Sequence, residues 1–260
     1  MKPPNIGLYK VMSKISAELP LKKVNQVKLT CPYRSENDDV FVIVPAFNEE
    51  RVIFDVVEGL CEFFRHVVVV DDGSTDATVE CLDNRAVTLL KHSVNLGQGA
   101  ALQTGITYAL QQGAQYVVTF DADGQHLAKD AISMLQELKK GECDVVVGSR
   151  FLGKAVNMPI SRRWLLKLAI LFSNITSGIR LTDTHNGLRA LSRKAAQALN
   201  FTQNGMAHAS EILEQFSQAR LVLKEMPVTI QYTEYSLNKG QSAGNTINIL
   251  IDLVVGRLLK

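Results

Sequence analysis

Two aspartates placed two residues apart at the end of an apolar run could hold a divalent cation. Residues 117–120 are β-branched and aromatic, as in a buried strand, and Asp121, Asp123 and Gln125 follow them. Positions i and i+2 of an extended chain share a face, so both carboxylates can point the same way. Like charges at this spacing repel unless a cation lies between them, and such oxygen ligands suit Mg2+ or Mn2+. The same residues could instead form only a turn before a helix, so the rest of the chain must decide.

The composition is that of an ordinary globular protein, with 46% hydrophobic and 21% charged residues in a chain of 260. One α/β domain or two small domains fit this length. The net charge of +2 is too small to indicate nucleic-acid binding, so no nucleic-acid partner is expected. The four cysteines lie far apart without C-x-x-C spacing, so we expect no zinc site and no disulfide framework, and a cytoplasmic setting is the simplest. We expect neither a signal peptide nor a membrane-spanning helix.

Apolar runs typical of strands alternate with segments of helical spacing between residues 40 and 148. The predicted strands are residues 40–44, 66–70, 86–91, 117–120 and 144–148, and the predicted helices begin near residues 52, 76, 95 and 129. This alternation predicts an α/β fold with a doubly wound, mostly parallel sheet, in which ligands bind beyond the carboxyl ends of the strands. The unusual loops all follow strands, at residues 45–49, 71–74, 95–99, 121–125 and 148–150. Loops gathered at one edge favour a binding site over unrelated turns.

The remaining segments suggest three divisions of the chain. Residues 1–38 predict a loosely packed or disordered extension, residues 39–245 the main domain, and residues 246–260 an apolar helix that packs on protein or lies on lipid. Within the domain, residues 159–172 predict a basic, aromatic and apolar helix, either packed on the sheet edge or lying at a membrane surface. After it we expect a polar loop (183–190), helices (192–199 and 208–219), a strand (221–232) and a basic loop (239–242).

Six motifs occur in a fixed order along the chain. They are VPAFNEE (44–50), VVDDGSTD (69–76), NLGQGA (95–100), DADGQH (121–126), GSR (148–150) and DTHNGLRA (183–190). Over residues 40–245 the chain resembles family 2 glycosyltransferases of the GT-A fold, nearest to the dolichol-phosphate mannose synthase and polyprenyl-phosphate glycosyltransferase branch. The resemblance implies a metal-dependent, inverting hexosyltransferase that uses a UDP- or GDP-sugar.

The implied acceptor is a polyprenyl phosphate or a saccharide or lipid-linked acceptor, in cell-surface polysaccharide or glycolipid synthesis. The enzyme would then work in the cytoplasm or on the inner face of the cytoplasmic membrane, and a homo-oligomer is compatible with it. One departure bears on this. The C-terminal pattern, YTEYS (232–236) followed by KGQS (239–242), differs from the Arg, Gly and Ser-Lys pattern of polyprenyl-phosphate enzymes and is similar to a bacterial surface-polysaccharide subgroup.

The resemblance also implies roles for individual residues. Those expected to contact the nucleotide are Pro45, Phe47, Glu49, Asp72 (through the base), Gly97 and Gln98. The expected metal ligands are Asp121, Asp123 and Gln125. The basic side chains expected to face phosphates are Arg150, Arg162 or Arg163, and Lys239. Asp123, Arg150 and Glu211 are the expected catalytic residues.

A base is needed only if the acceptor is a hydroxyl, because a phosphate is already anionic. Glu211 is the candidate base and His208 a weaker one, whereas His126 and His185 could either contact the substrate or orient their neighbours. A nucleotidyltransferase is disfavoured because the loop after the first strand is acidic. A dehydrogenase is disfavoured because no G-x-G-x-x-G follows that strand. A non-catalytic nucleotide-sugar-binding protein remains an alternative, against which the intact aspartates argue.

Overall fold

The computed structural model describes residues 37–83, 85–201 and 208–239. The predicted extension up to residue 36 and the predicted apolar helix over residues 246–260 therefore lie outside the described residues. No helix within the described ranges is long and apolar enough to cross a bilayer.

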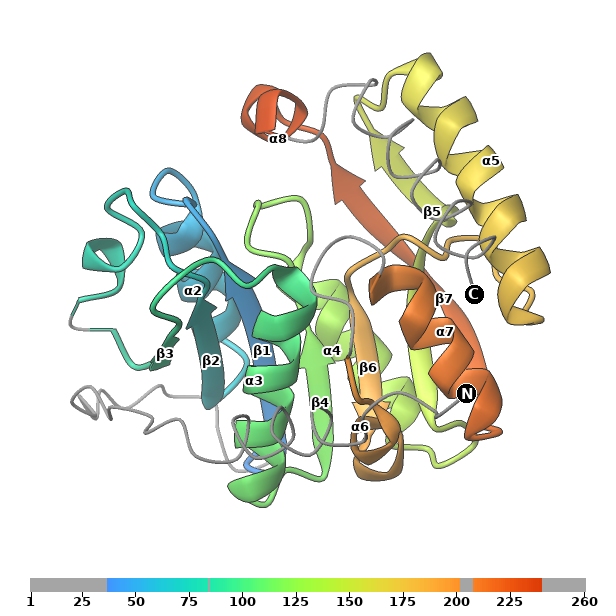
Figure 1. The fold of residues 1–260 in the computed structure, drawn as a ribbon, viewed down its shortest axis with the longest axis horizontal. Coiled ribbons are helices and arrows are strands. Elements are labelled where there is room, and N and C mark those ends of the chain that lie inside the picture. The colour runs from blue at the N-terminus through green and yellow to red at the C-terminus, as the bar shows by residue number, and fades with distance from the viewer. Residues whose placement is uncertain (1–36, 84, 202–207, 240–260) are drawn as a thin grey trace, which may run out of the picture.

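A seven-stranded sheet in the order β3-β2-β1-β4-β6-β5-β7 forms the centre of the fold (Figure 1). Its strands are β1 (Val40–Ala46), β2 (His66–Asp71), β3 (Thr88–Lys91), β4 (Tyr116–Thr119), β5 (Val145–Val156), β6 (Arg189–Ser192) and β7 (Leu223–Gln231). The pairs β1–β2, β1–β4, β2–β3 and β5–β7 are parallel. Only β6 in the described sheet runs antiparallel, between β4 and β5. The prediction of a mostly parallel, wound sheet is confirmed.

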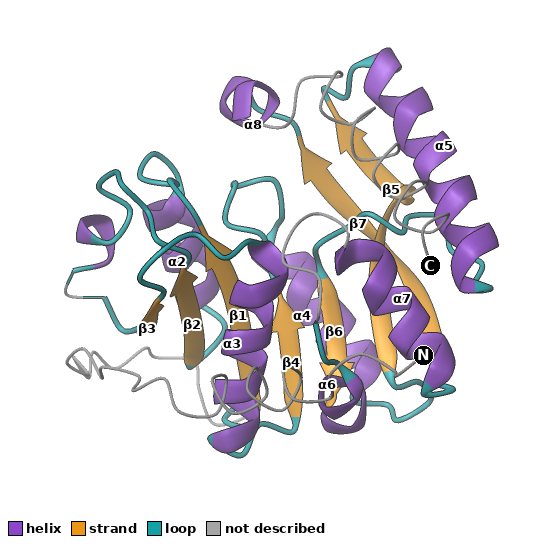
Figure 2. Cartoon of the chain, in the orientation of Figure 1, coloured by secondary structure: helices purple, strands orange, loops and turns teal. Residues whose placement is uncertain are grey.

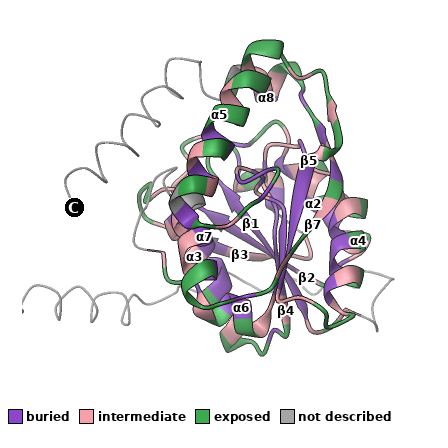
Figure 3. Ribbon diagram, turned by 90° about the vertical axis from the view of Figure 1, so that its right-hand side faces the viewer, coloured by how far each residue is buried: buried purple, intermediate pink, exposed green. Residues whose placement is uncertain are grey.

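Helices cover both faces of this sheet (Figure 2). They are α2 (Ile53–Cys61), α3 (Gln98–Gln111), α4 (Ala128–Leu138), α5 (Ile160–Ser177), α6 (Arg193–Ala198), α7 (His208–Gln218) and α8 (Glu234–Lys239). Figure 3 shows α2 and α4 on one side of the strands and α3, α6 and α7 on the other. Two separate apolar cores result, one under each helical layer.

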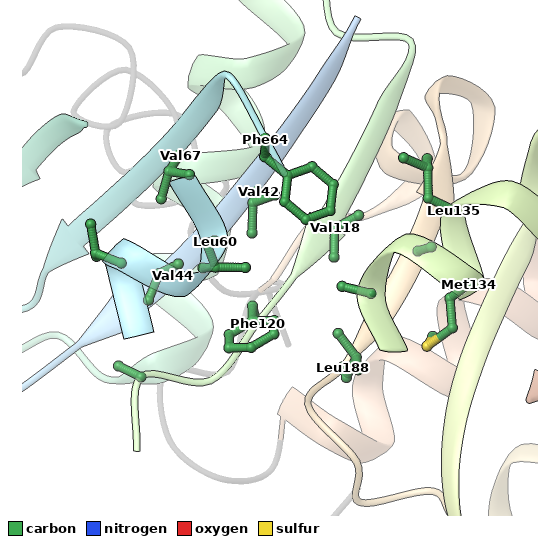
Figure 4. Close-up of a cluster of buried hydrophobic side chains, with 14 of the residues drawn as sticks. Val42, Val44, Leu60, Phe64, Val67, Val118, Phe120, Met134, Leu135 and Leu188 are labelled. Carbon is green, nitrogen blue, oxygen red and sulfur yellow. The ribbon is translucent and has the colours of Figure 1, made fainter. Parts of the chain in front are cut away.

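The strand β1 explains why both layers are needed. All seven of its residues are buried. Val42 and Val44 point into the core under α2 and α4, where Phe64 and Met134 also lie (Figure 4), whereas Ile43 points into the opposite core. A strand buried on both faces reads as a continuous apolar run, which is why its sequence predicted it so clearly.

One predicted helix is wrong. Residues 76–80 do not begin an α-helix, and only a short 3-10 turn, Glu80–Leu82, follows. Asp76 accepts the backbone amides of Glu50 and Thr78, and the hydroxyl of Thr78 accepts the amide of Glu49. These side chains bind loop backbone instead of capping a helix, which is the usual competition of short polar residues with helix formation.

Two loop predictions are also corrected. The predicted loop 183–190 ends in β6, whose four residues were too few and too irregular to show a strand pattern. The predicted loop 239–242 begins inside α8, since Lys239 is the last residue of that helix. Residues 240–242 lie outside the described residues.

Candidate active site

The loops after β1 and β2 are joined by hydrogen bonds at the carboxyl edge of the sheet. The amide of Asn48 donates to Ser74 Oγ (2.9 Å), and the amide of Thr75 donates to Asn48 Oδ1 (2.8 Å). The two strands are parallel, so their ends meet at the same edge and place these residues together. In this joined pair of loops Pro45 is buried, whereas Phe47 is 38% exposed. The loop predicted to grip a nucleotide is therefore fixed in place while its aromatic ring reaches solvent.

Asp72 organises the loop that precedes α3. Its buried carboxylate accepts the amides of Leu96 (2.9 Å) and Gly97 (2.7 Å) and lies 2.7 Å from Nδ1 of His92. Gly97 has φ +95°, a conformation that favours glycine, and it ends a turn that leads into α3. Asp72 thus holds the Gly97 turn in shape, and its predicted contact with a base stays a prediction.

Asp121 and Asp123 form the acidic centre of the rim. Asp121 Oδ1 accepts a hydrogen bond from the side-chain Nε2 of Gln98 (2.9 Å), and Asp121 Oδ2 lies 3.1 Å from Nε2 of His126. Burial, followed by the charge of Asp121, raises the pKa of Asp123 to about 6. The direction of the second effect is that of one negative charge acting on another, and a cation bound at both carboxylates would relieve it.

A divalent cation fits this donor set. Within the described part of the chain, no cluster of three His, Cys, Asp or Glu side chains is arranged to hold a metal. A cation here would therefore rest on two carboxylates and would take further oxygen ligands from a bound phosphate or water, as Mg2+ commonly does. Gln125 is buried, and its backbone amide donates to the carboxylate of Asp123 (3.1 Å).

Residues 187 and 189 complete the acidic centre, and no role was predicted for them. A Cβ built on Gly187 would lie 1.9 Å from Asp121 Oδ2, so only glycine leaves room for that carboxylate. Arg189 is 2% exposed, and burial lowers its pKa, while the charges of Asp121 and Asp183 oppose this shift. The motif DTHNGLRA contained both residues, but its sequence did not show that antiparallel β6 brings this motif against Asp121.

Arg150 is buried in a network of hydrogen bonds. Its Nε donates to Asp183 (2.6 Å), Nη1 to the hydroxyl of Tyr232 (2.7 Å) and Nη2 to the carbonyl of His185 (3.0 Å). Burial alone would lower its pKa, but the charges of Asp183 and Tyr232 and the hydrogen bonds to both residues together outweigh burial, and the pKa of Arg150 is raised. These contacts fix the orientation of the Arg150 guanidinium, and its predicted contact with a phosphate stays a prediction.

The two arginines of α5 differ in their surroundings. Arg162 is half-buried, with its guanidinium 5.1 Å from the ring centre of Tyr232. Arg163 is exposed. Because Tyr232 also bonds Arg150, Arg162 is the arginine that the fold joins to the site.

Lys239 reaches from α8 to the loop after β1. Its amine donates to the carbonyls of Phe47 (2.9 Å) and Asn48 and lies 3.0 Å from Glu49 Oε1. Tyr235 donates to Glu49 Oε2 (2.8 Å). The pKa of Glu49 is raised, chiefly by burial, despite these partners. The structure thus brings together two predicted residues that lie 190 positions apart in the chain.

The histidines and Glu211 are placed as follows. His126 packs edge-on against Phe120 beside Asp121, and whether it orients its neighbours or contacts the substrate stays a prediction. His185 is half-buried, and burial lowers its pKa. Glu211 is half-buried in the first turn of α7, and its role as a base stays a prediction. The side chain of His208 lies outside the described residues.

Comparisons with known proteins agree with this geometry. The family model described as glycosyl transferase family 2 matches residues 41–199. The UDP-N-acetylglucosamine–dolichyl-phosphate N-acetylglucosaminyltransferase of Methanococcus voltae is 32% identical over 85% of this chain and 97% of that protein. The undecaprenyl-phosphate mannosyltransferase of Micrococcus luteus is 29% identical over 80% of this chain and 89% of that protein.

The solved structures show the same fold. A crystal structure of glucosyl-3-phosphoglycerate synthase from Mycobacterium tuberculosis, in complex with Mn2+, UDP and glucosyl-3-phosphoglycerate, matches with a TM-score of 0.65 and 19% identity over 84% of this chain and 79% of that one. With the family model and the first of these relatives, this places the chain among known proteins: it belongs to glycosyl transferase family 2 and is a glycosyltransferase with the GT-A fold.

Proposed function

We propose that the enzyme moves a sugar from a UDP- or GDP-sugar to a polyprenyl phosphate, with inversion and with Mg2+ or Mn2+ at Asp121 and Asp123. The observation that carries this proposal is the bond between Gln98 and Asp121. It joins the Gly97 turn, which leads into α3, to the acidic centre. A nucleotide lying along that turn would present its diphosphate to the cation, since the start of a helix also offers free backbone amides to anions.

The main contribution of the protein side chains is to hold the groups that would bind the cation and the nucleotide in fixed positions. When bound, the cation would stabilise negative charge on the diphosphate leaving group. Asp121 is held by Gln98 and His126, so its carboxylate meets the cation in a fixed orientation. Asp72 holds the Gly97 turn in a shape in which the protein backbone could approach the nucleotide closely. Preorganised groups of this kind lose little free energy to reorganisation during the reaction.

Two considerations support a phosphate acceptor. The two relatives described above are named for transfer to dolichyl phosphate and undecaprenyl phosphate. A phosphate is already ionised, so transfer to it needs no base, whereas a saccharide hydroxyl would require one and would give Glu211 that task. Arg162 and exposed Arg163, at the start of α5, are cations that such a phosphate could bind. The enzyme would then work peripherally on the inner face of the cytoplasmic membrane.

The test is a panel of UDP- and GDP-sugars offered with a short-chain polyprenyl phosphate, with Mn2+, with Mg2+ and with EDTA. We expect one nucleotide class to be consumed only with metal, and the sugar to appear on the lipid. Asp123→Asn should abolish turnover, whereas Glu142→Gln, at a side chain that is 68% exposed, should not. Full turnover by Asp123→Asn or in EDTA would remove the metal assignment. Transfer only to saccharides would remove the lipid acceptor, and synthesis of a nucleotide sugar from a sugar phosphate would indicate the nucleotidyltransferase alternative.

A further inference from the structure

The helix α5 has two faces of opposite character. Its inner face is buried and includes Ala169, Ile170 and Ser173. Its outer face carries large apolar side chains at a spacing of three or four residues, each between 57% and 77% exposed: Ile160, Trp164, Leu168, Leu171 and Ile175. Figure 3 shows exposed residues along this helix. An apolar stripe on a solvent face is unusual for a monomeric protein and indicates a binding surface.

The strand that precedes α5 in the chain also carries exposed apolar side chains. Leu152 and Val156 of β5 are 51% and 41% exposed, and Figure 2 shows the far half of β5 beside α5. Elsewhere in the described part of the chain, the exposed large apolar side chains are Phe47, Val94, Leu96 and Val222. Most of the exposed apolar surface therefore gathers in one region, between residues 152 and 175, which we term the α5 face.

The segment of the chain that carries the α5 face has charged side chains of one sign. Residues 145–182 contain no Asp or Glu, although Asp144 and Asp183 adjoin them. The basic residues outside the buried Arg150 in this segment are Lys154, Arg162, Arg163, Lys167 and Arg180. The amine of Lys167 lies 5.7 Å from the ring centre of Trp164. Apolar side chains bordered by cations fit a surface that is apolar beneath and anionic on top, which describes an anionic bilayer.

Other occupants fit the charge less well. A second copy packed on the same face by two-fold symmetry would bring like charges at Arg163 and Lys167 together. The chain's own residues 240–260 hold Arg257 and Lys260 against the single acid Asp252, so they offer little negative charge. We therefore propose that the α5 face docks the enzyme on an anionic lipid bilayer.

The inner face of α5 connects this docking surface to the site. Arg162 lies over Tyr232, and Ser173 Oγ is 3.3 Å from His185 Nε2, while Tyr232 and His185 both bond Arg150. A helix lying in the lipid interface would place the active-site rim at the membrane surface. The inference does not depend on which acceptor the enzyme uses.

Trp164 allows a direct test because it is the single tryptophan of the chain and is 65% exposed. The full-length protein is mixed with vesicles of phosphatidylcholine alone, or with about 30 mol% phosphatidylglycerol. We expect the tryptophan emission to shift to the blue and the protein to co-sediment with the anionic vesicles, and both effects to weaken as salt is raised. The variant Leu168→Glu/Ile175→Glu should bind about tenfold more weakly or worse. The matched control Val222→Glu, at an exposed valine before β7, should bind like the native protein.

The lipid-binding measurements test the docking proposal, and the donor-hydrolysis assay tests the proposed reaction. Emission that is already blue without vesicles, and is unchanged by them, would show that protein covers Trp164. Equal binding by Leu168→Glu/Ile175→Glu, or equal binding to neutral vesicles, would also overturn the proposal. Metal-dependent donor hydrolysis without vesicles should stay native in that variant, which shows that it folds. If the native protein hydrolysed no nucleotide sugar, that result would instead contradict the proposed function.

Discussion

Replacing Gly187 with alanine should damage the acidic centre without unfolding the protein. The new Cβ would lie 1.9 Å from Oδ2 and 2.3 Å from Cγ of Asp121, whereas such contacts essentially never fall below 3.0 Å. The carboxylate must therefore move by about 1 Å, and a misplacement of this size in a catalytic group can reduce activity about 100-fold. The carboxylate is the free end of a side chain, so the backbone need not move. Its bonds to Gln98 and His126, however, would be strained or lost.

The assay compares kcat/KM and the Mn2+ concentration for half-maximal activity in Gly187→Ala and the native enzyme, with thermal unfolding of both. We expect a fall in kcat/KM of about 100-fold, a higher Mn2+ requirement and a nearly unchanged melting temperature. The matched control is Gly59→Ala, because a Cβ there meets no atom within 4 Å and should if anything stabilise α2. Native kcat/KM in Gly187→Ala would refute the reasoning that this glycine reserves the space occupied by Asp121.

Three further changes test other parts of the site. Asp72→Asn should raise KM for the donor about tenfold with little change in kcat, because the Gly97 turn loses a charged acceptor. Arg150→Met should lower the free energy of unfolding by about 3 kcal/mol, measured with urea, because it leaves Asp183 buried without its ion pair. Burial lowers the pKa of His185 in the folded protein. As the pH falls, the unfolded chain therefore binds a proton at this imidazole before the folded protein does. The free energy of unfolding should therefore fall below about pH 6.5, and less steeply in His185→Gln.

Each of these predictions has its own control and its own contradictory result. Exposed Asp83→Asn should leave KM unchanged, and an unchanged KM in Asp72→Asn would remove the link between Asp72 and the nucleotide. Exposed Lys154→Met should cost little stability, and an equally small loss in Arg150→Met would mean that the buried pair contributes nothing. Identical slopes of unfolding free energy against pH in native protein and His185→Gln would show that this imidazole is not the group that titrates.

Much of the fold and the site could be predicted from sequence because the signals were local. The apolar run of β1 is buried on both faces, so every residue reports the same state. The loops after β1, β2 and β4 had to meet because parallel strands end at one edge. Asp121 and Asp123 lie in one such loop, two residues apart, so the charge of Asp121 can act on Asp123 and raise its pKa.

Contacts between distant segments were decided only by the tertiary structure. The four residues of β6 show no strand pattern, and their antiparallel pairing with β4 is what brings Gly187 against Asp121. The resemblance implied that Arg150 faces a phosphate, but only the fold shows that Arg150 is buried with Asp183 and Tyr232. The sequence of α5 allowed either packing or membrane contact. Which apolar side chains face inward depends on the rotation of the helix about its axis, and packing against the rest of the domain fixes that rotation.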